Sequence, residues 1–176
     1  LALNETISSL WNASRQGALP VVVDTSPCTY GLRSREGLTD ENRDRASRMQ
    51  ILDAVEYFAS TVPPRLTIRR RKPSGTLHPV CSLVKMGLTS HLLAVASAAS
   101  ERTYVPPSAG CCGFAGDRGW LVPELTASAT AAEAAEIAGT SSAGFYSSSR
   151  TCEIGLTRAT GQHYESWVHL LDWATR

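Results

Sequence analysis

The chain has 176 residues, a formal net charge of +1 and 43% hydrophobic residues. This length is enough for one domain with a sizeable core. The balanced charge creates no general attraction for nucleic acid, and no apolar run approaches the roughly 18 residues that cross a bilayer. We therefore expect no nucleic-acid partner and no transmembrane segment.

The first half of the chain begins with a strand signal and continues with a helical pattern. Residues 20–24 are a β-branched apolar run, which predicts a buried strand. From Asp40 the apolar period becomes helical, with Ile51, Val55, Phe58 and Val62 on one face, and two prolines at 63 and 64 close the segment. The pattern predicts one helix from Asp40 to the prolines.

Strand and helix signals then alternate to the end of the chain. Strands are predicted at residues 66–70, 77–80, 102–106 and 143–147, and helices at residues 82–100, from Pro123 to Gly139, and around Tyr164, Trp167, Val168 and Leu171. This order predicts an α/β fold, in which a mostly parallel sheet carries helices on both faces in Rossmann-like layers.

Each cysteine motif follows a predicted strand. Cys28 follows residues 20–24, Cys81 follows residues 77–80, and the remaining thiols, which are Cys111, Cys112 and Cys152, follow the next two strands. Ligands of such sheets gather beyond the carboxyl ends of the strands. We therefore expect the cysteines to converge at that edge.

A weak repeat suggests how the chain is divided. Residues 26–32 and 150–156 both read Cys-x-x-Gly-Leu after a short strand. The repeat predicts that residues 1–40 are the tail of a preceding cysteine-rich half, in which Cys28 would be a metal-binding cysteine, and that residues 41–176 are a complete half. The start of the chain has no initiator Met, which favours a fragment of a longer protein.

Adjacent cysteines followed by glycine are typical of a metal or redox site. Two neighbouring thiols serve little packing purpose, whereas thiolates bind soft metals and iron–sulfur clusters. Gly113 would let the backbone approach a cofactor closely. The spacing of Cys81, Cys111, Cys112 and Cys152 fits neither a zinc ribbon nor a bacterial ferredoxin run.

Residues 77–87, 110–119 and 151–155 together resemble the CCG-type cysteine-rich domain. That domain occurs in heterodisulfide reductase, in glycerol-3-phosphate dehydrogenase, and at the C-terminus of FAD-linked D-lactate dehydrogenase or glycolate oxidase-like oxidoreductases. The resemblance implies that Cys81, Cys111, Cys112 and Cys152 hold an iron–sulfur cluster, with [4Fe-4S] as the expected type.

The family pattern ends in Cys-x-x-Cys. In this chain the first cysteine of that pattern is Cys152, but the position of the second is occupied by Gly155. Zinc is therefore an alternative metal. His78 could donate to a cluster sulfur or bind zinc, although a loop histidine bonded to backbone is the favoured interpretation. Without a metal, the thiols would be buried hydrophobes, a disulfide such as one between the neighbouring cysteines, or a thiol-redox pair.

The resemblance also implies a setting for the domain. FAD would be bound in a missing part of the parent chain, upstream flavin and ferredoxin-like domains would deliver electrons, and a downstream acceptor would receive them. The isolated fragment should have no dehydrogenase activity, because nothing in it resembles an FAD-binding domain. The expected location is cytoplasmic, and a peripheral position at the inner face of the membrane is compatible with it.

Overall fold

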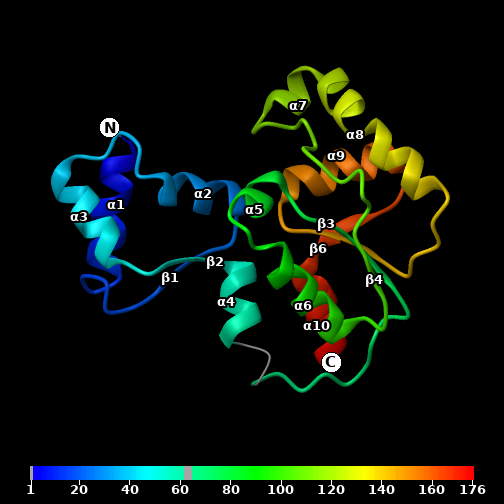
Figure 1. Cartoon of the computed structure of the whole chain (residues 1–176), viewed down its shortest axis with the longest axis horizontal. Coiled ribbons are helices and arrows are strands. Elements are labelled where there is room, and N and C mark those ends of the chain that lie inside the picture. The colour runs from blue at the N-terminus through cyan, green and yellow to red at the C-terminus, as the bar shows by residue number, and fades with distance from the viewer. Residues whose placement is uncertain (1, 62–64) are drawn as a thin grey trace.

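A computed structural model describes residues 2–61 and 65–176 of the chain. Its described residues form an α/β structure with two parallel sheets, surrounded by helices (Figure 1). The predicted α/β fold is thereby confirmed, including the position of the cysteine motifs after the carboxyl ends of strands. No helix in the part of the chain that is described is long and apolar enough to span a membrane.

The first third of the chain forms a small unit with its own core. Its elements are α1 (Ala2–Ala13), β1 (Val21–Val23), α2 (Ser26–Ser34), α3 (Asp40–Arg48) and β2 (Ile51–Asp53). Helices α1 and α3 pack together, and β1 pairs with β2 in parallel. Its buried side chains are those of Ile7, Trp11, Leu38, Ala46, Met49 and Ile51.

The remaining residues build the larger sheet. Its elements are α4 (Ala54–Thr61), β3 (Gly75–His78), α5 (Cys81–Lys85), α6 (Thr89–Ala99), β4 (Thr103–Tyr104), α7 (Arg118–Leu121), α8 (Pro123–Ala138), β5 (Phe145–Ser147), α9 (Arg150–Thr160), β6 (Tyr164–Ser166) and α10 (Trp167–Thr175). All strand pairs are parallel, in the order β4-β3-β5-β6. Helix α8 packs on α9, whereas α6 packs on α4 and α10, and Figure 1 shows these two groups on opposite sides of the strands.

This strand order places a switch point between β3 and β5. The chain moves from β3 outward to β4, then crosses back over β3 to β5 and continues to β6. Connections on the two sides of the β3–β5 pair therefore run in opposite directions. In open parallel sheets a crevice forms at such a point, outside the carboxyl ends of the strands.

The helix predicted from Asp40 to the prolines is wrong as a single element. Helix α3 ends at Arg48, and β2 follows before α4 begins. Ile51 and the two residues after it pair with β1, and this pairing provides backbone hydrogen bonds that a helix would have to replace. Val62 and the prolines lie outside the described residues.

Three other sequence expectations also need correction. Residues 66–70 form no strand, and there the amide of Arg69 instead donates to the Ala174 carbonyl at the end of α10. The helix expected at residues 82–100 is split into α5 and α6 at Gly87, which has a φ of +73°. Tyr164 lies in β6, so it is not part of the closing helix, and Val168 is exposed.

Candidate cysteine site

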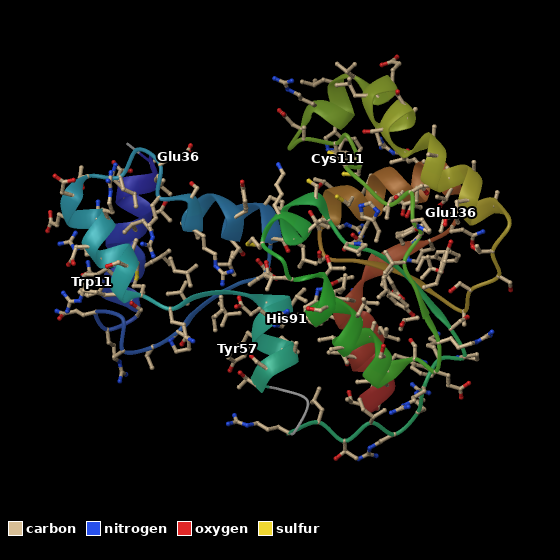
Figure 2. All side chains as sticks on the ribbon, in the orientation of Figure 1. Trp11, Glu36, Tyr57, His91, Cys111 and Glu136 are labelled. Carbon is tan, nitrogen blue, oxygen red and sulfur yellow. The ribbon has the colours of Figure 1, made fainter. Side chains whose placement is uncertain are left out.

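Four thiols lie beyond the carboxyl ends of three neighbouring strands. Cys81 begins α5 shortly after β3, Cys111 and Cys112 lie in the loop after β4, and Cys152 lies in the first turn of α9 after β5. These strands are adjacent in the order β4-β3-β5, so the site sits at the switch point. Figure 2 shows sulfur atoms grouped beside the labelled Cys111.

The closest pair of thiols is Cys112 and Cys152, whose Sγ atoms are 2.8 Å apart. Both side chains are buried. A hydrogen bond from Cys152 lowers the pKa of Cys112 to about 6, and the backbone amide of Phe114 and the electrostatic interaction with the nearby His78 ring act in the same direction. The same hydrogen bond, together with burial, raises the pKa of Cys152. At neutral pH the pair is therefore a Cys112 thiolate that accepts from a Cys152 thiol.

The other two thiols belong to the same electrostatic group. Burial raises the pKa of Cys81, and so do Cys111 and Cys112, while Lys85 opposes them. Cys111 is exposed and its Sγ accepts from the Gly113 amide at 3.4 Å. Cys81 and Cys111 also contribute to raising the pKa of Cys152. Each of the buried thiols thus responds to charge on its neighbours.

The donor set suits a soft metal, but the spacing is that of a hydrogen-bonded pair. Two thiolates at about 2.3 Å from one tetrahedral zinc would lie about 3.8 Å apart. Cys112 and Cys152 are closer than this, yet farther apart than the roughly 2 Å of a disulfide. Among residues 2–61 and 65–176, no group of three or more His, Cys, Asp or Glu side chains is arranged to hold a metal. Binding would require these two sulfurs to separate.

His78 makes a contact that the sequence did not predict. Its ring is fully buried at the end of β3, and Nδ1 lies 2.9 and 3.0 Å from the carboxylate oxygens of Glu133 on α8. The favoured interpretation, a loop histidine bonded to backbone, is therefore wrong. Nε2 has no hydrogen-bond partner within the described part of the chain. A carboxylate on one ring nitrogen with the other left free is typical of histidines that bind or orient a reactive centre.

Glu133 could have been found from its helix. The buried residues of α8 are Thr126, Thr130, Glu133 and Ile137, at spacings of four, three and four. Glu133 therefore occupies the inner stripe of an Ala-rich helix, where a carboxylate requires a partner. The pattern identifies the buried acid, but its partner comes from β3 and is 55 residues away in sequence.

Gly113 allows the loop after the two cysteines to approach helix α8 closely. Its φ is +68°, and an added Cβ would lie 2.7 Å from the Leu125 carbonyl oxygen and 2.8 Å from the Ala129 Cβ. The turn after the two cysteines is thus pressed onto α8. The predicted contact of Gly113 with a cofactor stays a prediction.

The absence of a second cysteine after Cys152 also has a packing reason. A Cβ on Gly155 would lie 2.9 Å from Thr126 Cγ2 and 3.4 Å from the Phe114 ring. Because glycine has no side chain, α9 can pack tightly against α8 at this position. A cysteine at position 155 would therefore collide with α8.

Cys28 stands apart from the four coupled thiols. It lies in helix α2, which follows β1 and contacts α5, and its side chain is exposed. It makes no hydrogen bond with another thiol of the described residues. Its expected role in a preceding cysteine-rich half stays a prediction, as does the boundary at residue 40.

Comparison with known protein families and with curated proteins finds no match for this chain. The resemblance to the CCG-type domain therefore depends on the three cysteine-containing segments alone.

Proposed function

We propose that this chain is the electron-transfer domain of an FAD-dependent D-lactate or related 2-hydroxy acid dehydrogenase. In this proposal Cys81, Cys111, Cys112 and Cys152 hold an iron–sulfur cluster. The supporting observation is that these four thiols come from three neighbouring strand ends and that Cys111 and Cys112 raise the pKa of both Cys81 and Cys152. An electron-transfer role also agrees with the exposure of Cys111, which places one edge of the site at the surface.

The protein groups around Cys112 favour its thiolate. The Cys112 thiol has a pKa of about 6, so this ligand is deprotonated at neutral pH before any metal arrives. Cys152 is protonated in the same state and would lose its proton on binding, which makes affinity depend on pH. The Gly113 amide would remain a donor to Cys111. When bound, an iron–sulfur cluster supplies one-electron transfer.

The proposal places the domain in a longer cytoplasmic chain. Flavin and ferredoxin-like domains upstream would deliver electrons, and a separate acceptor would take them from the exposed edge. The domain alone would then carry out no dehydrogenation.

Anaerobic reconstitution with ferrous iron and sulfide tests the proposal. The chain should turn brown and retain iron and acid-labile sulfide, whereas Cys112→Ser and Cys152→Ser variants should retain much less of both. Cys28→Ser is the matched control and should bind like the wild type, because Cys28 is exposed on helix α2 and makes no hydrogen bond with another thiol of the described residues. Colourless wild-type protein without iron or sulfide would contradict the proposal. Stoichiometric zinc, with a melting temperature that falls on chelation, would support the zinc alternative.

A metal-free thiol-redox role is the second candidate, and the 2.8 Å contact of Cys112 with Cys152 favours it. The Cys112 thiolate would attack a disulfide substrate, forming a mixed disulfide and releasing one thiolate. Cys152 would then lose its proton to solvent and attack Cys112, releasing the second thiolate, so that two electrons pass to the substrate. Treatment with a small disulfide followed by mass spectrometry should reveal a Cys112–Cys152 bond. A mixture of other pairings would count against this role.

A further inference from the structure

A cavity of about 370 Å³ lies at the amino ends of β3 and β4, on the edge of the larger sheet opposite to the cysteines. Its third wall is the segment between α8 and β5. The volume is within the range of small-molecule sites. Seven of its nine lining residues carry a hydroxyl, and the other two are Gly75 and Arg102. The lining is therefore suited to a ligand that forms many hydrogen bonds.

Arg102 is the one charged residue of the lining, and its charge is unopposed there. Its Nε donates to the Pro73 carbonyl at 3.5 Å, and its two terminal nitrogens make no hydrogen bond or ion pair with a residue that the structure describes. Glu136 lies outside the lining, and its carboxylate accepts from the hydroxyls of Tyr104 and Ser108. A guanidinium with both terminal nitrogens free can bind an acid group through two parallel hydrogen bonds.

The segment after α8 offers further donors. The backbone amides of Ser141 and Ser142 make no hydrogen bond within the described part of the chain. The Ile137 carbonyl, in the last turn of α8, already accepts from both the amide and the hydroxyl of Thr140, at 2.9 Å each. The unpaired backbone groups on this wall therefore include two donors beside each other, which suit an anion or a ligand oxygen.

The lining hydroxyls keep hydrogen-bonding capacity for a ligand. The Ser142 hydroxyl donates to a carbonyl two residues away, so its lone pairs stay free to accept. The Ser74 hydroxyl accepts from the Ala143 amide at 3.0 Å, so its hydrogen stays free to donate. Thr76 is 1% exposed, but its oxygen keeps some accessible surface and has no hydrogen-bond partner among the described residues. Ligand hydroxyls could use all of these groups.

We propose that this cavity binds a small anion that carries several hydroxyls, such as a sugar acid. Arg102 and the free amides of Ser141 and Ser142 would hold the acid group, and the lining hydroxyls would bond to the hydroxyls of the ligand. The site lies on the other edge of the sheet from the thiols, so it does not depend on the function proposed above.

Calorimetric titration of the full chain tests the proposal with two hydroxylated acids, gluconate and glucose 6-phosphate. At least one should bind saturably and about tenfold more tightly than glucose, which lacks the acid group, and than acetate and inorganic phosphate, which lack the hydroxyls. The tighter of the two identifies the acid group that Arg102 binds. Chemical-shift changes at the amides of Gly75 and Ser141 would locate the ligand. No saturable binding of either acid, or equal binding of glucose, would overturn the proposal.

A charge variant locates the acid group. Arg102→Gln removes the charge and should lower the affinity for the bound acid by about tenfold. The matched control is Arg71→Gln, which removes an exposed arginine outside the lining and should bind like the wild type. Equal weakening in the two variants would show that only the general charge of this surface attracts the acid, which would overturn the site.

A second variant tests the hydroxyls. Thr76→Val keeps the branched shape of the side chain in β3 and removes its hydroxyl, and should weaken binding by about fivefold. Thr67→Val is the matched control, because Thr67 is exposed and outside the lining. Urea unfolding checks that both variants fold like the wild type. Unchanged affinity in both Arg102→Gln and Thr76→Val would overturn the assignment of the cavity.

Discussion

Substituting alanine at Gly113 tests why a glycine follows the two cysteines. The residue has a φ of +68°, and a new Cβ would meet the Leu125 carbonyl oxygen at 2.7 Å and Ala129 at 2.8 Å. Gly116 lies in the same loop, has a φ of +75°, and has nothing within 4 Å of an added Cβ. The two glycines share the backbone conformation and differ in the space around it.

The expected difference in unfolding free energy between Gly113→Ala and Gly116→Ala follows from the space around the two glycines. A left-handed conformation costs an alanine about 1–2 kcal/mol at either position. Overpacking against α8 adds about 1–3 kcal/mol at Gly113 only. The reduced entropy of the unfolded chain is the same for both substitutions and cancels. Gly113→Ala should therefore lose about 1–3 kcal/mol more unfolding free energy than Gly116→Ala.

Urea unfolding of both variants measures these values directly. The same samples should be reconstituted with iron and sulfide, because the two possible roles of Gly113 differ in that readout. Equal losses of stability in the two variants would refute the packing argument. A Gly113→Ala variant as stable as Gly116→Ala but unable to bind a cluster would show that this glycine makes room for a cofactor.

Two further predictions concern the buried polar groups. Glu133→Ala leaves the His78 ring without its partner and should cost about 2–4 kcal/mol of unfolding free energy, measured in urea. The control is Glu124→Ala on the exposed face of the same helix, which should cost about 0.5 kcal/mol. Similar losses in the two variants would mean that the buried contact contributes little to stability. Alkylation of Cys112, followed by mass spectrometry of its peptide, should slow as the pH falls through its pKa of about 6, because the reactive thiolate becomes protonated there. Cys152→Ala removes the hydrogen-bond donor and should move this midpoint to higher pH, and an unchanged midpoint would contradict the assigned donor.

Local signals predicted β1, β3, β4, β5 and one long helix, but they missed β2 and β6. Helix α8 begins at Pro123 and ends before Gly139, because proline suits a first helical turn and glycine suits a C-terminal position. The apolar runs at residues 20–24, 77–80 and 143–147 overlap β1, β3 and β5. Alternation of strands with helices was enough to predict parallel pairing, since a parallel connection needs a crossover.

Pairing between distant segments could not be predicted from local patterns. Ile51, Val55 and Phe58 have helical spacing, yet Ile51 belongs to a strand because β1 lies beside it in space. Likewise, no local pattern indicates a partner for Arg70 and Lys72, yet both place their charges over the Trp173 ring from α10. In each case the partner is far away in sequence.

The position of the candidate site was predicted from the sequence, but the buried contact between His78 and Glu133 was not. Strand order brings Cys81, Cys111, Cys112 and Cys152 to one edge, as the motif positions indicated. Glu133 carries no motif, and its contact depends on the register of α8 against β3. Metal occupancy stays a prediction.

The two separate hydrophobic clusters have a consequence for partial unfolding. Helix α2 belongs to the small unit formed around Ile7 and Trp11, whereas Cys112 and Cys152 belong to the larger core. Helix α2 also contacts α5, which begins with Cys81, so local opening of the small unit would uncover this end of the sulfur group while the larger core stays folded. Mild denaturant or limited proteolysis should therefore increase the reactivity of Cys81 before that of Cys152.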